Sequence, residues 1–454
     1  MARGGIDCAG HCARGLGDGL CLSSNPGGIA LMAAALYRAM LVHSLDRHSV
    51  EWFADGALLV ERGRILAYGD YATISQDFPG VPTMDWRDSI IIPGLVDIHA
   101  HVAQLSGVGS DRADLLDWLE QVIYPLERCC ADDDVAASIA DAFFQRALAA
   151  GTTTIAAFAP PFESATERCF EVADELGIRA VMGMTLMDMN APAYLVADSN
   201  KLIAATERLA TRWHNHRRLH YCITPRFAGS CSFTLLRRCG ELASATGLPI
   251  QTHLAESRAE LELIANLFPE SSDYTDVYQR AGLLTDKTIL AHCIHLSTTE
   301  LERLSTASPA IAHCPASNTY LQSGIMPLVE YLDRWNLRVG LGTDIGAGYH
   351  ASILDEARTA REHAKLRRMS QQTLRVPSHA EAFYLATLGG AIALSLGDEV
   401  GNVLPGKAAD FVRIRRAPYR TITTTDDALA YVLYAASDSI YATMIEGIPV
   451  WQKP

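Results

Sequence analysis

The chain has few of the features that mark proteins acting on nucleic acids or in membranes. Its 454 residues contain 38 lysines and arginines against 52 aspartates and glutamates, a formal net charge of −14, and no basic run. Nucleic-acid backbones and anionic membranes bind basic surfaces, so the composition argues against both as partners. No stretch approaches the roughly 18 apolar residues that a membrane-spanning helix needs. We therefore expect neither a nucleic acid nor a membrane as a partner.

The eleven cysteines show no regular spacing and no CxxC pair. Such a pattern is typical of reduced thiols that are buried as small apolar side chains in a cytosolic protein, rather than of a disulfide framework or a structural zinc site. The sequence therefore predicts a cytoplasmic location.

The chain is long enough for one large domain and one smaller one. Residues 1–36 are rich in Gly, Ser and Asn and lack helix or strand periodicity, so we expect a disordered leader. Short strands with turns occupy residues 37–92 and return at 401–454. End segments of similar texture most simply pair with each other, which predicts one composite β-sandwich domain interrupted by residues 93–400.

The central segment alternates apolar strands with amphipathic helices, the pattern of a parallel βα fold. Eight strands are expected, at residues 90–98, 153–158, 179–185, 219–223, 249–252, 288–291, 310–313 and 338–342. Eight such units favour an α/β fold of the (β/α)8 TIM-barrel type. An open doubly wound sheet is the alternative, but no GxGxxG motif follows an early strand.

Two histidines two residues apart end the first of these strands. In a strand, positions i and i+2 point to the same side, so His99 and His101 can both face one metal ion. His214 and His216 have the same spacing but close a helix-like run, where i and i+2 diverge, so we interpret them as solvated surface residues.

Other candidate ligands fall at the carboxyl ends of later strands: His253, His292 and Asp344. In a barrel these ends meet at one mouth, where barrel enzymes carry out their chemistry. Imidazole and carboxylate ligands suit zinc, iron or manganese, and an open site lowers the pKa of bound water toward about 7. Each histidine alone could instead be a hydrogen-bonded structural residue.

Glu256 lies three residues beyond His253, at the expected rim of the barrel. A carboxylate there could move protons between water, a ring nitrogen and a leaving group. The alternative is a surface glutamate that opens a helix over residues 257–267.

The segment from Pro93 to His101, with the later histidines and the Gly-Thr-Asp at 342–344, resembles the metal-dependent amidohydrolase superfamily in its aminohydrolase branch. Gln104 and the segments 224–227, 312–318 and 341–344 are most similar to the members of that branch that deaminate guanine. The resemblance extends from about Tyr37 almost to the C-terminus and has no counterpart for residues 1–36. It implies a barrel with a composite β domain, one zinc, hydrolysis of guanine to xanthine and ammonia, and often a homodimer.

The resemblance also implies roles for single residues. His99, His101, His253 and Asp344 would hold the zinc, and Asp344 would also act as a base on the attacking water. Glu256 would protonate the ring nitrogen next to the attacked carbon, and His292 would bond the water. Gln104, Arg226 and Phe227 would bind the purine. No lysine stands at a strand end to bridge two metals, which favours one metal ion.

Two other functions stay open. A related aminohydrolase could act on another amino-purine, a triazine or a pyrimidine, with Arg226 and Gln104 matching a different ring edge. A catalytically dead scaffold should have lost ligands or the acid, yet all are present. The HxE and PCxxC pattern of cytidine-type zinc deaminases is absent. For Arg226 itself, the alternative is a salt-bridged arginine at the barrel rim.

Overall fold

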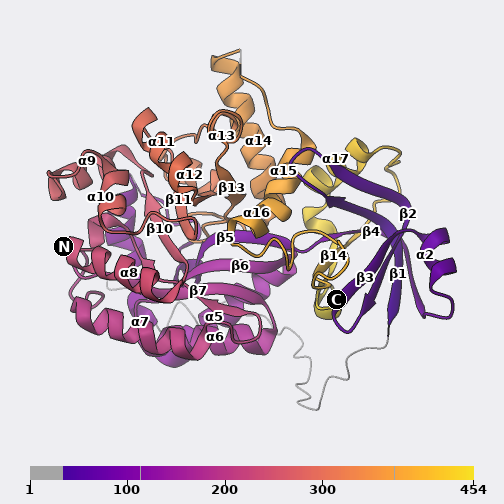
Figure 1. Cartoon of the computed structure of the whole chain (residues 1–454), viewed down its shortest axis with the longest axis horizontal. Helices are drawn as coiled ribbons and strands as arrows, with labels where there is room; N and C mark the ends of the chain where they lie inside the picture. The colour runs from indigo at the N-terminus through magenta and orange to yellow at the C-terminus, as the bar shows by residue number, and fades with distance from the viewer. Residues whose placement is uncertain (1–33, 113, 373) are drawn as a thin grey trace.

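The computed structural model describes residues 34–112, 114–372 and 374–454. A larger βα body lies beside a smaller β-rich one that contains strands from both ends of the chain (Figure 1). The first described strand begins at Ala35, two residues before the expected boundary at 37. The predicted disordered leader otherwise falls on residues 1–33, which lie outside the described residues.

The smaller body is built on a seven-stranded sheet of order β16-β15-β14-β4-β1-β2-β3. Its strands are β1 (Ala35–Ser44), β2 (Val50–Glu61), β3 (Arg64–Asp70), β4 (Thr83–Pro93), β14 (Phe411–Arg415), β15 (Ile440–Ile445) and β16 (Ile448–Gln452). Only β1 and β4 pair in parallel. Strands from the two ends of the chain meet where β4 pairs with β14. They form one continuous sheet, so the sandwich arrangement and the domain boundaries stay predictions.

Eight successive parallel units form the larger body, as the sequence predicts. They are β5 (Leu95–His101), β6 (Thr152–Ala159), β7 (Arg179–Leu186), β8 (Leu219–Tyr221) with β9 (Thr224–Pro225), β10 (Ile250–Leu254), β11 (Thr288–His292), β12 (Ala310–His313) and β13 (Arg338–Leu341). A parallel bridge from Ile223 to Ile250 joins the two halves, and the Asp344 amide donates to the His99 carbonyl across the seam between β13 and β5. The α/β barrel prediction is confirmed.

One strand boundary differs from the prediction. The sequence places residues 90–98 in the first barrel strand, but Ile90–Ile92 belong to β4 in the smaller sheet, and the barrel strand starts at Leu95. A strand buried on both faces reads as a continuous apolar run in either sheet, so the pattern does not separate the two. The Gly94 amide donates to the Asp410 carbonyl at this junction.

Helices follow most barrel strands and surround the barrel in Figure 1. The longer ones have eight or more residues: α5 (Asp133–Ala149), α6 (Glu163–Leu176), α7 (Ser199–Trp213), α8 (Phe233–Thr246), α9 (Arg258–Leu267), α11 (Thr298–Ala307), α14 (Ile353–Ser370), α15 (His379–Ala386) and α17 (Thr425–Ala435). The shorter ones are α2 (Tyr71–Asp77), α3 (Leu115–Trp118), α4 (Tyr124–Cys129), α10 (Tyr274–Arg280), α12 (Pro315–Tyr320), α13 (Leu328–Asp333) and α16 (Leu388–Ala393). In the described part of the chain, none of these helices has the length and apolar character to cross a membrane.

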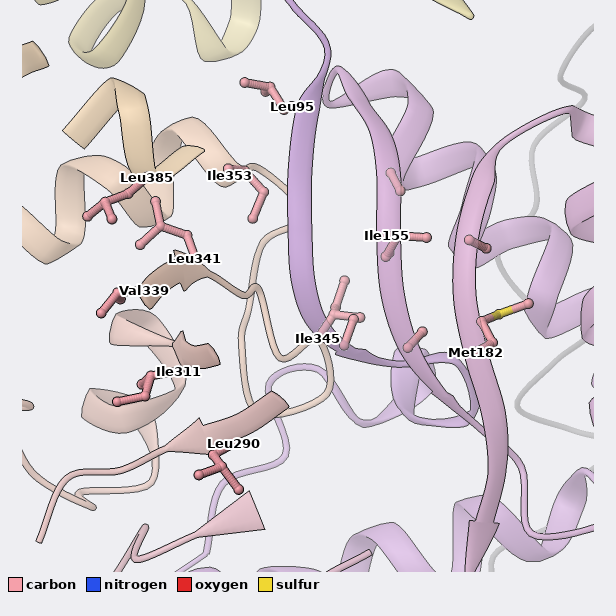
Figure 2. Close-up of a cluster of buried hydrophobic side chains, with 14 of the residues drawn as sticks. Leu95, Ile155, Met182, Leu290, Ile311, Val339, Leu341, Ile345, Ile353 and Leu385 are labelled. Carbon is pink, nitrogen blue, oxygen red and sulfur yellow. The ribbon is translucent and has the colours of Figure 1, made fainter. Parts of the chain in front are cut away.

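The strands of the barrel wall lie between two apolar clusters, one outside the barrel and one inside it. Figure 2 shows the outer cluster, in which side chains such as Leu95, Ile155 and Met182 leave β5, β6 and β7. The inner cluster holds side chains of β5, β6, β11 and β12, among them Val96, Ile98, Ala156, Ala291 and Ala312. This alternation is the period of two expected for strands, and it fills the barrel as a packed core.

The alternation shifts by one residue just before the histidine pair. Val96 and Ile98 point into the inner cluster, whereas His99 and His101 share the metal-ligand group, so the four cannot all follow a strict period of two. The pairing of β5 with β6 is irregular between Asp97 and Ala100, which permits the shift. Such irregularities re-aim side chains next to active sites.

Close approach of β13 to β5 depends on Gly342. A Cβ atom at this position would lie 2.7 Å from the His99 Cβ and 3.0 Å from the His99 carbonyl oxygen. The Asp97 carboxylate supports the same seam, because it accepts from the Thr343 hydroxyl at 2.5 Å and the Thr343 amide at 3.0 Å.

We predict that Gly342→Ala lowers stability by about 1–3 kcal/mol, since the added methyl overpacks the seam that positions His99 and Asp344. A melting-temperature measurement with a parallel activity assay checks this. The Gly342 φ is not in the left-handed region, so unfolded-state entropy alone would stabilise the variant. An unchanged or raised melting temperature would therefore contradict the crowding argument.

Candidate metal centre and active site

The structure brings the predicted ligands together at the carboxyl ends of the barrel strands. His99 and His101 lie at the end of β5, His253 lies in β10, and His292 is the last residue of β11. Asp344 follows β13 by three residues. All are buried except His253, which is partly exposed. Spacing in the sequence predicted this convergence.

The donor atoms of these residues are close enough to bind a single ion. Two overlapping groups, His99 with His101 and His253, and His99 with His292 and Asp344, each have their atoms within 4.8 Å of one another. The Nε2 atoms of His101 and His253 are 3.2 Å apart, and the Nε2 of His99 is 3.2 Å from Asp344 Oδ1. His99 Nε2 is buried without a hydrogen-bond partner. This set of imidazoles and one carboxylate fits a divalent metal.

The protonation states also suit metal binding. Burial lowers the pKa of His101 and of His253 well below the usual value, which keeps both rings neutral and able to donate a lone pair. Burial of Asp344 opposes its ionisation, but the imidazoles of His99 and His292 outweigh it and hold the pKa of this carboxyl well below its usual range. Neutral imidazoles and an ionised carboxylate are the forms that bind metals.

Hydrogen bonds from outside the ligand group orient its members. The His253 Nδ1 lies 2.6 Å from the Arg226 carbonyl oxygen, which accepts its proton and leaves Nε2 free for a metal. The Ser317 hydroxyl donates to Asp344 Oδ2 at 2.6 Å. Asn318 Oδ1 lies 2.9 Å from His292 Nδ1. Residues 312–318 belong to the motif that the sequence supplied, but these orienting contacts were not predicted.

Strained backbone accompanies these strand ends. Ala255, His292 and Asp344 have φ angles of 52°, 69° and 47°, in the left-handed region that residues with a Cβ rarely adopt. Each such residue costs of order 1–3 kcal/mol, and such strain clusters at functional sites. The left-handed backbone conformation turns the chain sharply at these positions, next to the side chains that line the pocket.

Glu256 is buried, with 3% of its surface exposed. The alternative that it is a surface residue opening a helix is therefore wrong, and Ser257 caps α9 instead, in a capping box with Glu260. Burial raises the pKa of Glu256 to about 7, against the opposing effect of His292, whose Nε2 is 3.5 Å from Glu256 Oε2. A carboxyl poised near neutrality can both donate and accept a proton.

These groups line one pocket at the mouth of the barrel. The predicted residues in its wall are His101, Gln104, Arg226, Phe227, His253, Glu256, His292 and Asp344. His99 is not among the residues that line it. The sequence analysis missed the apolar part of the wall, formed by Leu115, Trp118, Leu119 and Leu321. Three of these residues lie before α4 and Leu321 follows α12, and no regular spacing in the sequence marks the four as one group.

Arg226 has a partner that the sequence did not indicate. Its Nη1 donates to both carboxylate oxygens of Glu127, at 2.7 and 2.8 Å, and Gln104 Nε2 donates to Glu127 Oε1 at 3.1 Å. Arg226 is therefore salt-bridged, as the structural alternative held, and it also lines the pocket. The two descriptions do not exclude each other.

The second histidine pair lies away from this site. His214 follows the end of α7 and is partly exposed, and His216 is exposed. Neither belongs to a potential metal-binding group among the described residues. Their interpretation as surface residues agrees with the structure.

The barrel and its metal-ligand group define an amidohydrolase site. The amidohydrolase family model matches residues 90–450, so the chain belongs to this family. A guanine deaminase from Escherichia coli (strain K12) is 35% identical over 417 residues, covering 89% of this chain and 93% of that protein. The chain is thus similar along most of its length to guanine deaminases.

Solved structures agree with this grouping. The guanine deaminase from C. acetobutylicum with bound guanine in the active site is 29% identical with a TM-score of 0.87, covering 92% of this chain and all of that one. An adenosine deaminase from Xanthomonas campestris with bound zinc is 25% identical with a TM-score of 0.81, covering 92% of each chain.

We predict that His99→Ala binds its metal at least about tenfold more weakly than the unmodified protein, because the substitution removes a buried nitrogen donor. Metal analysis after dialysis against a chelator series measures the loss. His214→Ala is the matched control, a histidine of identical spacing outside the site, and should retain full metal. Equal metal retention by both variants would contradict the proposed centre.

Proposed function

We propose that the chain catalyses the hydrolytic deamination of guanine to xanthine and ammonia. The observation that carries this proposal is the single pocket that unites a metal-ligand group, the buried carboxyl of Glu256 and the guanidinium of Arg226. The similarity to guanine deaminases over most of the chain supports the choice of substrate. The complete set of ligands and the buried acid argue against a catalytically dead scaffold.

The metal in this proposal is one zinc ion per chain, held by His99, His101, His253 and Asp344. When bound, zinc lowers the pKa of water and so supplies a nucleophile at neutral pH. The donor set supports zinc, since imidazole and carboxylate are its usual ligands in catalytic sites. A solved relative with bound zinc adds support.

The side chains of the pocket move the protons. Asp344 and His292 would orient the attacking water and accept its first proton, with His292 Nε2 3.8 Å from Asp344 Oδ2. Glu256 would donate a proton to the ring nitrogen beside the carbon that carries the amino group. The first water proton would then pass from Asp344 to that amino group, which leaves as ammonia. The second water proton would return to Glu256 as the water oxygen becomes the carbonyl on the ring carbon. The net exchange is one amino group for one carbonyl.

Binding of the base would use the far wall of the pocket. Arg226 can only donate hydrogen bonds, so it favours a purine with a carbonyl oxygen over one with an amino group at the same position. Phe227 and the apolar residues Leu115, Trp118 and Leu119 offer flat or branched surfaces to the ring faces.

The proposal extends to a cytoplasmic homodimer. Buried thiols such as Cys169, whose pKa burial raises to about 12, support a reducing compartment. The dimer rests on the resemblance to the family, and light scattering of the purified protein tests it.

We predict that Glu256→Gln lowers the rate of guanine hydrolysis by at least about 10²-fold while the metal is retained, because the amide cannot transfer the proton. Ammonia release and metal analysis of the same sample measure both quantities. Glu300→Gln is the control, since Glu300 is a carboxylate buried to a similar degree but does not line the pocket. A Glu256→Gln rate within a few-fold of the unmodified enzyme would remove the assigned role.

A substrate panel separates guanine from the alternatives. We expect guanine to be hydrolysed at least about 10²-fold more efficiently than adenine, because adenine would place an amino group against the donor Arg226 and leave both unpaired. Ammonia release from guanine, adenine, cytosine and an amino-triazine is the measurement. Preferred turnover of any of the other three would favour the related aminohydrolase.

A further inference from the structure

Glu127 is a buried acid that the proposed reaction does not use. It lies on α4, and its side chain is 4% exposed, against 3% for the Arg226 side chain that it contacts. Two charges removed from water are tolerated when they pair with good geometry and further hydrogen bonds. Here both carboxylate oxygens accept from Arg226 Nη1, and one also accepts from Gln104.

This arrangement determines which groups Arg226 can offer a ligand. Its Nη1 is committed to the carboxylate, while the described contacts of its side chain leave Nε and Nη2 without a protein acceptor. The Tyr124 ring, three residues before Glu127, lies 5.4 Å from the guanidinium carbon and limits its rotation. Arg226 therefore faces the pocket as a hydrogen-bond donor held in one orientation.

The same carboxylate orients the Gln104 amide. A flipped amide would set its oxygen against Glu127 Oε1, an acceptor facing an acceptor, so the observed contact requires the NH2 group to face Glu127. The amide oxygen is then the group that Gln104 can offer to a ligand. The Glu127 carboxylate thus leaves Arg226 as a donor and Gln104 as an acceptor toward a ligand.

A donor beside an acceptor complements a ring edge that carries a carbonyl next to an N–H. Guanine has this edge, with its 6-oxo group and the adjacent ring N–H, whereas purines without the oxo group lack it. We propose that Glu127 is a positioning residue that determines specificity for 6-oxo purines by orienting Gln104 and Arg226. The inference rests on the proposed function and deepens it.

Competitive inhibition by two ligands tests the proposal in the zinc-loaded enzyme. Hypoxanthine has the 6-oxo group and the adjacent N–H, and purine has neither. Glu127→Gln removes the negative charge and puts an NH2 donor in place of one of the two oxygens that accept from Arg226. In this variant we expect the Ki of hypoxanthine to rise about 10- to 100-fold. The Ki of purine should change less than about threefold, and the KM of guanine should rise more than kcat falls.

Two further variants make the result decisive. Glu127→Asp keeps the buried charge, should fold even if Glu127→Gln does not, and should recover part of the preference for hypoxanthine. Asp410→Asn breaks another buried ion pair, with Arg179, far from the pocket, and should lower the melting temperature without altering either Ki. An equal loss for both ligands in the Glu127 variants, or an unaltered hypoxanthine preference, would overturn the proposal.

The outcomes distinguish this proposal from that of the function. Failure of the unmodified enzyme to hydrolyse guanine would contradict the proposed activity whatever Glu127 does. Normal guanine hydrolysis, with an unchanged ratio of the two Ki values in folded, zinc-containing Glu127→Gln, would leave the activity standing and remove the role of Glu127.

Discussion

The pocket depends on placing one carboxylate and several imidazoles at one point that is buried from bulk solvent. Asp344 lies 3.2 Å from His99 and 3.4 Å from His101, and His99 Nε2 has no hydrogen-bond partner. Buried groups of this kind destabilise a fold unless they are compensated. A bound metal ion would supply that compensation, because the donor atoms of these residues are grouped closely enough to serve as its ligands.

The rest of the mouth is organised to hold these groups in place. Asp97 ties β5 to the turn that carries Asp344, and Gly342 lets the two strands approach. One segment after β12 supports three groups, because Ser317 contacts Asp344, Asn318 contacts His292 and Ser323 contacts Glu256. Side chains that are held at strand ends by such contacts have the precise placement that an acid and a nucleophile need.

A second buried network of hydrogen bonds lies at the pocket, and its proposed role is to orient the substrate. The contacts among Gln104, Glu127 and Arg226 involve no candidate metal ligand side chain, yet the Arg226 carbonyl accepts from His253 Nδ1. The chain segment of Arg226 thus joins both networks. Substrate orientation and metal geometry are linked through one residue, so a change at the specificity wall can also displace a ligand.

Periodicity and spacing determined much of this protein. The alternation of short apolar strands with amphipathic helices predicted the eight barrel units. The i and i+2 spacing placed His99 and His101 on one side, and the motifs indicated the family. The tertiary structure alone decided that Ile90–Ile92 belong to the smaller sheet, since a doubly buried strand reads alike in both sheets. It also decided the partner of Arg226, because Glu127 is 99 residues away and a contact between segments so distant in the chain leaves no periodic trace in the sequence.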